Sequence, residues 1–94
     1  MPSSPIRTEC TFHGLVQGVG FRWTASTIAE SEGVSGWVRN APDGTVVMLV
    51  EGSPEATRRV LEGLEARLPG HITHLEALET PASGEFSGFR ILRG

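Results

Sequence analysis

Polar and hydrophobic residues alternate along the first part of the chain. On one side of a predicted strand lie Ile6, Thr8, Cys10 and Phe12, and on the other lie Arg7, Glu9, Thr11 and His13. A period of two residues is typical of a β-strand with one face buried and one face in water. We therefore predict a half-buried strand, in which Cys10 is a small buried hydrophobe rather than a reactive thiol.

Two later segments carry hydrophobic residues at helical spacing. The first runs from Phe21 to Glu32, and Gly33 after it is a suitable C-terminal cap. The second begins after Ser53, whose hydroxyl can accept from an unpaired first-turn amide, with Pro54 in the first helical position. Pro69-Gly70 ends it, and its hydrophobic stripe consists of Ala56, Val60, Leu61, Leu64 and Leu68.

Four more strands are predicted, over Val34–Asn40, Thr45–Glu51, Ile72–Glu79 and Phe89–Leu92. The turn residues Ala41-Pro42-Asp43-Gly44 join the first two of these into a hairpin. The third alternates weakly, with Ile72, Leu75 and Ala77 facing inward across a bulge. Residues Pro81–Gly88 form a loop before the last strand.

Before the short last strand, the order strand, helix, strand, strand, helix, strand predicts an α+β fold of the ferredoxin-like β-α-β-β-α-β type. In this two-layer sandwich, both helices cover one face of an antiparallel sheet. The first and third strands are central neighbours, and the second lies beside the third. The 94 residues fit one domain, and we expect residues 1–5 to be flexible. Because many activities share this architecture, the fold alone does not identify the function.

The charge balance excludes some classes of function. The formal net charge is −3, and the basic residues are eight scattered arginines, so a general nucleic-acid surface is not expected. No stretch reaches the ~20 apolar residues of a spanning helix, and no basic region followed by an apolar run indicates a signal peptide. One cysteine and three histidines at unrelated spacings form no metal-site pattern. We expect a cytoplasmic monomer that binds no nucleic acid, membrane or metal.

Glycines are concentrated in Gly14–Arg22 (GLVQGVGFR), at the predicted turn from strand to helix. Glycine tolerates positive φ and has no side chain to block a ligand, so successive amides around Gly14, Gly18 and Gly20 can converge on an anion, and the free first-turn amides of the helix add to them. Arg22 adds a charged fork of donors that fits a phosphate or a carboxylate. The spacing matches neither G-x-G-x-x-G nor a Walker A loop, so the ligand is expected to be smaller than a nucleotide. On spacing alone, a plain glycine-rich turn with a solvated Arg22 remains open.

Several other residues allow two interpretations. Asn40 either aims its carboxamide at the glycine loop or opens the turn that follows it. Gln17 either contacts the anion through its side chain or shapes the loop. Trp23 and Trp37 are interpreted as packing anchors rather than as platforms for stacking bases.

Together these motifs resemble the acylphosphatase family, whose signature is a G-x-V-Q-G-V-x-F-R loop followed by G-W-V-x-N. The sequence has Gly14–Arg22 for the first and Gly36-Trp37-Val38-Arg39-Asn40 for the second. Asp43-Gly44, Glu51-Gly52 and Phe86-Ser87-Gly88-Phe89 extend the likeness over essentially the whole chain. One departure is in the last residues, Ile91-Leu92-Arg93-Gly94, where members often have Ile-Arg-Tyr.

The resemblance implies hydrolysis of acyl phosphates to a carboxylate and inorganic phosphate, in which Arg22 binds the phosphate and Asn40 positions the attacking water. The residues implied to bind the phosphate, mainly through backbone amides, are Gln17, Gly18, Val19, Gly20, Phe21 and Arg22. A carboxylate leaves without protonation, because its conjugate acid has a pKa of ~4. Positioning and charge stabilisation then carry most of the reaction, and no metal or cofactor is expected.

Two rival functions remain open. A non-catalytic ferredoxin-like module would bind a small anion or regulate a partner without turning anything over. A relative of the acylphosphatase-like domain of carbamoyl-transfer maturation proteins would handle carbamoyl phosphate, although no cysteines that could bind zinc follow the motifs.

Overall fold

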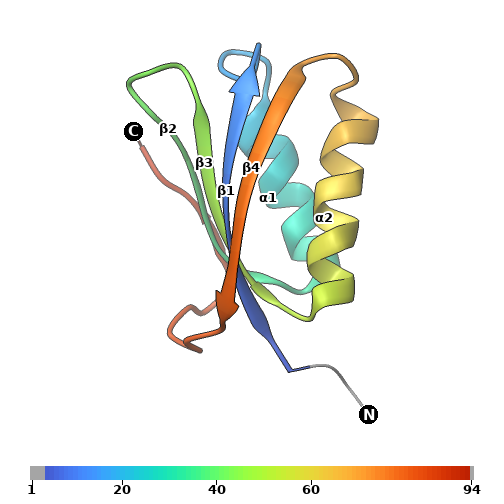
Figure 1. The fold of residues 1–94 in the computed structure, drawn as a ribbon, viewed down its shortest axis with the longest axis vertical. Coiled ribbons are helices and arrows are strands. Elements are labelled where there is room, and N and C mark those ends of the chain that lie inside the picture. The colour runs from blue at the N-terminus through green and yellow to red at the C-terminus, as the bar shows by residue number, and fades with distance from the viewer. Residues whose placement is uncertain (1–3, 94) are drawn as a thin grey trace.

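Two helices pack on one face of a five-stranded sheet in the computed structural model of the chain, which describes residues 4–93 (Figure 1). The strands are β1 (Ile6–Gly14), β2 (Ser35–Asn40), β3 (Val46–Gly52), β4 (Ile72–Pro81) and β5 (Phe89–Ile91), and the helices are α1 (Phe21–Glu32) and α2 (Pro54–Arg67). The order across the sheet is β4-β1-β3-β2-β5. The predicted two-layer α+β fold is confirmed, with β1 and β3 as central neighbours and β2 beside β3.

The predicted antiparallel sheet needs one correction, because β5 runs parallel to β2. Gly36 lies opposite Phe89 and Val38 opposite Ile91, whereas the other three strand pairs are antiparallel. The chain leaves β4 at one edge of the sheet, crosses its width, and enters β5 at the opposite edge from the same end (Figure 1). This reversal of direction makes β5 antiparallel to β4 and therefore parallel to β2.

Local signals place both helices where the sequence predicts them. Gly33 ends α1 in the left-handed conformation, with φ 72°. Ser53 caps α2 by accepting from the Ala56 amide at 3.1 Å, and Pro54 is its first residue.

The inward position predicted for Ala77 does not bury it. Ala77 lies opposite Cys10 in the sheet, on the helix side, but it is exposed because β4 is an edge strand. Among the described residues, no helix has the length and apolar character needed to span a membrane.

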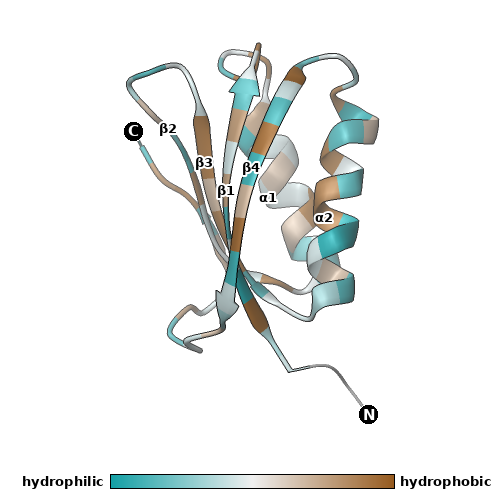
Figure 2. Ribbon diagram, in the orientation of Figure 1, coloured by the Kyte–Doolittle hydropathy of each residue, from teal (hydrophilic) through white to brown (hydrophobic). Residues whose placement is uncertain are grey.

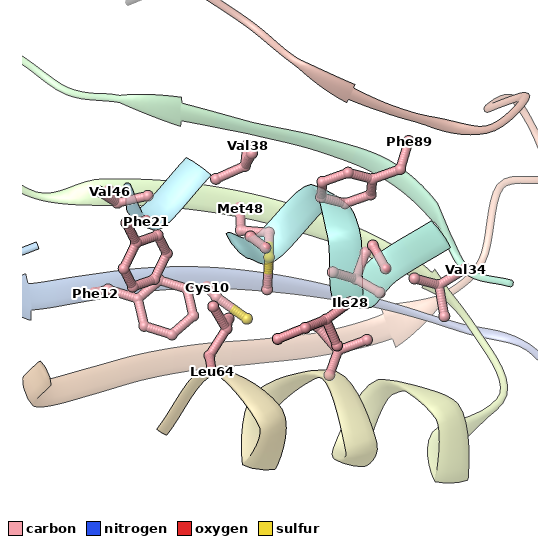
Figure 3. Packing of buried hydrophobic residues seen from close by; sticks show 14 of the residues in the cluster. Cys10, Phe12, Phe21, Ile28, Val34, Val38, Val46, Met48, Leu64 and Phe89 are labelled. Atoms are coloured by element: carbon pink, nitrogen blue, oxygen red, sulfur yellow. The ribbon is translucent and has the colours of Figure 1, made fainter. Parts of the chain in front are cut away.

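The hydrophobic core fills the space between the sheet and the helices (Figure 3). The rings of Phe12 in β1 and Phe21 in α1 lie 4.8 Å apart at their centroids, so the core holds both ends of the loop that joins these elements. Cys10 is fully buried, and burial raises the pKa of its thiol to about 12, which confirms its prediction as a core residue. Figure 2 shows β3 as hydrophobic along much of its length and the outward side of α2 as hydrophilic.

Residues 82–88 cross from β4 to β5. Glu51 in β3 holds this crossing segment to the far face of the sheet, which is the face opposite the helices. The carboxylate accepts from the amides of Ser83 and Gly84, each at 2.9 Å, and from the Arg7 guanidinium at 2.8 Å. Burial opposes ionisation of Glu51, but these hydrogen bonds outweigh it and lower its pKa from 4.5 to about 2. The fastened segment delivers β5 to its place beside β2.

The expectation for residues 1–5 concerns mainly residues 1–3, which lie outside the described part of the chain. Of the other two, Pro5 accepts a hydrogen bond from the Ala82 amide at 3.4 Å, at the start of the crossing segment. Both Ser4 and Pro5 are exposed.

Candidate active site

A cavity of about 340 Å³ lies where the loop after β1 meets the start of α1 and the ends of β2 and β5. Its lining includes Gly18, Gly20, Arg22 and Asn40. The structure therefore brings together the two side chains and the glycine loop that the sequence singles out. The loop and Asn40 meet here because β1 and β2 are both antiparallel to β3, which places the ends of these two strands at the same end of the sheet.

The three glycines of the loop have different tasks. Gly18 (φ 78°) and Gly20 (φ 77°) are left-handed, and a Cβ on either would meet no protein atom within 4 Å. Their conformation, rather than a shortage of space in the protein, requires glycine. Gly14 (φ 123°) differs, because its Cβ would lie 2.2 Å from the His71 carbonyl oxygen. It allows β1 to pack closely against the start of β4 and is not part of the cavity lining.

The amides of residues 17–22 donate no hydrogen bond to any acceptor within residues 4–93. Backbone bonding resumes at Thr24, whose amide donates to the Gly20 carbonyl at 3.0 Å. Gly20 is the N-cap of α1 and supplies no side chain to the first turn. Free amides and the positive end of a helix thus lie beside the cavity, an arrangement that attracts anions.

Arg22 in the first turn of α1 is half-buried and lines the cavity. One of its terminal nitrogens, Nη1, donates to the Leu92 carbonyl oxygen at 3.3 Å. Arg22 forms no ion pair within residues 4–93, so no carboxylate of the described chain neutralises its charge. Its position and its free charge suit an anionic ligand.

Gln17 ties the glycine loop to the hairpin that follows β2. Its Nε2 donates to the carbonyl oxygens of Ala41 at 2.8 Å and Thr45 at 2.9 Å. Of the two interpretations of Gln17, the geometry supports the one in which it shapes the loop. The same two hydrogen bonds hold the loop beside Asn40, the last residue of β2.

The carboxamide of Asn40 makes no hydrogen bond within residues 4–93, and it lies at the cavity. The local hydrogen bonds of the turn come instead from Asp43, whose Oδ1 accepts from the Thr45 amide at 3.0 Å and from its hydroxyl at 2.7 Å. The turn therefore does not occupy the Asn40 side chain. Its two donors and its acceptor remain available to a ligand or a water molecule.

The interpretation of Trp23 as a packing anchor is wrong. Its side chain is 68% exposed and lines the cavity next to Arg22, whereas Trp37 is half-buried on the far face of the sheet. Ile91, the last residue of β5, and Arg93 also line the cavity, and the sequence reasoning missed both. A signal existed for Trp23, since the residue after Arg22 in a first helical turn must lie near the same loop.

The match to known proteins covers nearly the whole chain. A model of the acylphosphatase family matches residues 8–91. The chain belongs to the acylphosphatase family. It is 42% identical over 86 residues to an acylphosphatase of Nocardia farcinica, a match that covers 90% of this chain and 86% of the relative. The crystal structure of acylphosphatase from Bacillus subtilis matches with a TM-score of 0.86 at 30% identity, covering 93% of this chain and 98% of that one.

The acylphosphatase fold also occurs inside a much larger protein. The structure of T. kodakarensis HypF matches with a TM-score of 0.71 at 30% identity, covering 98% of this chain but 12% of that chain. The likeness to a HypF domain therefore spans the same elements as the likeness to the small acylphosphatases.

The acylphosphatase signature combines two kinds of residue. Gly36 has a φ of 135°, and a Cβ there would lie 1.8 Å from the Leu49 carbonyl oxygen, so this glycine allows β2 to pack against β3. Arg39 places its guanidinium 5.7 Å from the centroid of the Trp37 ring, away from the cavity lining. Of the G-W-V-x-N motif, only Asn40 reaches the cavity. The remainder of that motif is architectural.

Proposed function

We propose that this chain hydrolyses acyl phosphates to a carboxylate and inorganic phosphate by in-line attack of water on phosphorus, without a metal ion. The single observation that carries the proposal is that Arg22, which forms no ion pair within residues 4–93, and Asn40, whose carboxamide is free there, line one cavity with glycines of the loop whose amides have no backbone acceptor. Family membership supports the same activity, because relatives such as those of Nocardia farcinica and Paenarthrobacter aurescens, 42% and 34% identical to this chain, bear the name acylphosphatase.

The phosphoryl group occupies the glycine end of the cavity. The amides of residues 17–22 bind its oxygens, and Arg22 contributes two further donors and a full positive charge. Phosphoryl transfer spreads negative charge over these oxygens, so donors that are already in place stabilise the transition state without reorganising. The Gln17 hydrogen bonds and the Phe12–Phe21 contact fix the loop in advance.

Asn40 positions the attacking water. Its carboxamide oxygen can accept a hydrogen bond from the water while the water lone pair faces phosphorus, on the side opposite the leaving oxygen. The new P–O bond forms to water, and the bond between phosphorus and the acyl oxygen breaks with its electron pair going to the carboxylate. A phosphate oxygen takes the proton of the water, so the products are the carboxylate and inorganic phosphate.

The leaving group needs no acid catalyst. Carboxylic acids have pKa values of ~4, so the carboxylate departs unprotonated at neutral pH. This chemistry fits a cavity whose polar side chains are arginines and one asparagine. Histidine, cysteine and paired carboxylates have no step to perform in it.

We further propose that the protein acts in the cytoplasm as a monomer and single domain. A free buried cysteine suits a reducing compartment, and one hydrophobic core joins the sheet to both helices. Size-exclusion chromatography with light scattering tests the monomer, with a mass near 10.1 kDa expected.

A direct assay tests the hydrolysis. Purified protein is mixed with benzoyl phosphate in buffer containing EDTA, and the loss of acyl phosphate and the release of inorganic phosphate are followed together. The amount of acyl phosphate lost should equal the amount of inorganic phosphate released, and added phosphate should inhibit competitively. Binding of phosphate without turnover would instead identify the chain as a non-catalytic anion-binding module. Restoration of activity only by a divalent metal would contradict the proposed mechanism.

A further inference from the structure

The catalytic cavity extends beyond the part that a phosphoryl group fills. Its volume of about 340 Å³ lies within the range of roughly 300–1,000 Å³ that is usual for small-molecule sites. Beyond the glycines, Arg22 and Asn40, its rim is formed by Trp23, Ile91 and Arg93. The acyl part of a substrate must leave the phosphoryl group toward this rim.

The rim of the cavity carries exposed hydrophobic side chains, although most large hydrophobic residues of the described chain are buried. Four large hydrophobic residues of the described chain are clearly exposed, and two of them, Trp23 (68%) and Ile91 (44%), line this one cavity. They come from different elements, the first turn of α1 and the end of β5. Exposed hydrophobic side chains gathered at a site that also binds an anion are typical of a ligand with an apolar part.

We propose that Trp23 and Ile91 form a subsite for the acyl group, and that the protein favours acyl phosphates whose acyl group is aromatic or bulky and apolar. This inference rests on the proposed hydrolysis and adds a substrate class to it. Trp23 follows the phosphate-binding Arg22 directly, so the indole and the guanidinium are held by the same rigid helical turn. Ile91 is fixed by the pairing of β5 with β2, in which it lies opposite Val38.

The indole contributes more than the isoleucine. A tryptophan offers a wide flat face with few rotatable bonds, on which an aromatic ring packs at small entropic cost. An acetyl group is too small to cover both side chains, whereas a benzoyl ring can lie against the indole and bring its edge to the isoleucine. The gain therefore falls on substrate binding, with the chemical step left to Arg22 and Asn40.

The test compares benzoyl phosphate with acetyl phosphate in the parent protein and in Trp23→Ala, Ile91→Ala and Leu78→Ala. Leu78 is the matched control, since it is 59% exposed on β4 and does not line the cavity. For each variant, the fold loss of kcat/KM with benzoyl phosphate is divided by the fold loss with acetyl phosphate. This ratio cancels the different reactivity of the two acyl phosphates. We expect Trp23→Ala to raise KM for benzoyl phosphate about 3- to 10-fold, with a several-fold smaller effect for acetyl phosphate. Ile91→Ala should give a weaker effect of the same kind, and Leu78→Ala should change the ratio by less than twofold.

Binding of inhibitors supplies a readout that does not depend on turnover. Phenylphosphonate should inhibit the parent protein more strongly than methylphosphonate, and Trp23→Ala should remove most of that difference. Equal losses with both substrates, or equal inhibition by the two phosphonates, would overturn the acyl subsite while leaving the hydrolysis intact. If the parent protein preferred succinyl phosphate to both substrates, Arg93 would recognise the second carboxylate at the rim. That result would also overturn the apolar acyl subsite. Absence of all hydrolysis would instead refute the proposed function.

Discussion

The guanidinium of Arg22, in the first turn of α1, donates a hydrogen bond to the carbonyl oxygen of Leu92, 70 residues later in the chain. The amide of Leu92 in turn donates to the Val38 carbonyl at 2.8 Å, which continues the pairing of β5 with β2. A backbone carbonyl therefore holds one arm of the arginine, and the other donors remain for the ligand. The charge that we propose to bind phosphate is thus held by the chain just beyond β5 before substrate arrives.

Replacement of Arg22 should remove both phosphate affinity and turnover. We expect Arg22→Ala to lower kcat at least ~100-fold, the usual cost of losing one preorganised charge-stabilising donor. Arg22→Lys should restore little, because an ammonium group cannot bond the Leu92 carbonyl and clamp a phosphate in the same way. Steady-state kinetics and the inhibition constant for phosphate measure both effects. Arg58→Ala on the exposed face of α2 is the control for net charge, and equal behaviour of the two alanine variants would refute the role of Arg22.

Replacement of Asn40 should affect turnover more than affinity. Asn40→Ala leaves the loop amides and Arg22 in place, so the inhibition constant for phosphate should stay within about twofold while kcat falls at least ~10-fold. Asn40→Asp adds a negative charge beside the phosphoryl group and should also weaken phosphate binding. A weaker phosphate affinity in Asn40→Ala with unchanged kcat would show that the carboxamide binds the phosphate rather than the water.

Replacement of Gln17 should loosen the glycine loop. Gln17→Ala removes the hydrogen bonds to the Ala41 and Thr45 carbonyls and should lower the free energy of unfolding by roughly 1 kcal/mol. Gln17→Glu should cost more, because a carboxylate would face two carbonyl oxygens. Urea unfolding measures the stability, and phosphate inhibition measures the site. Full phosphate affinity in both variants would show that the loop keeps its shape without Gln17.

Glu51 should make stability depend on pH in the acid range. Burial alone would raise its pKa, but the bonds from Ser83, Arg7 and Gly84 lower it from 4.5 to about 2. Because the folded value lies below the unfolded one, the contribution is complete above pH 4.5 and is lost as the pH falls toward 2. We expect Glu51→Gln to lower the free energy of unfolding at pH 7 by roughly 2 kcal/mol and to make stability fall less steeply in acid. Glu9→Gln, an exposed substitution in β1, is the control. An equally steep loss of stability in acid for Glu51→Gln and the parent protein would contradict this prediction.

Replacement of either of two buried threonines by valine should stabilise the protein. The hydroxyls of Thr8 in β1 and Thr57 in α2 are buried and have no hydrogen-bond partner within residues 4–93. Valine has nearly the same shape and no hydroxyl to desolvate, so each replacement should raise the free energy of unfolding by up to ~1 kcal/mol. Thr11→Val, on the opposite face of β1, should change it little. A loss of stability in Thr8→Val and Thr57→Val would reveal partners for the two hydroxyls, which urea unfolding would detect.

The elements with strong local signals could be predicted from the sequence. The bounds of α1 follow from the glycines on either side of it, and the start of α2 follows from Ser53 and Pro54. The alternation from Ile6 to Phe12 gives the buried face of β1. In each case the preference of a few adjacent residues agrees with the final packing, so neighbouring information suffices.

The features that depend on distant segments could not be read in this way. The spacing of the glycines suggested an anion site, but the approach of Asn40 depends on two Gln17 hydrogen bonds to the next hairpin. The direction of β5 depends on a chain crossing that has no periodic pattern. The family resemblance supplied the pairing of Arg22 with Asn40, whereas composition and spacing left it undecided.

The hydrogen bonds from the crossing segment to Glu51 link the helix-free side of the sheet to Arg22, the arginine that we propose to be catalytic. Only a short run of chain separates Gly84 from the Leu92 carbonyl that steadies Arg22. Acid that protonates Glu51 would weaken its hydrogen bonds to the crossing segment, and with them the position of the Leu92 carbonyl that holds Arg22. We therefore expect the acid tolerance of catalysis to depend on a carboxylate that lies outside the cavity.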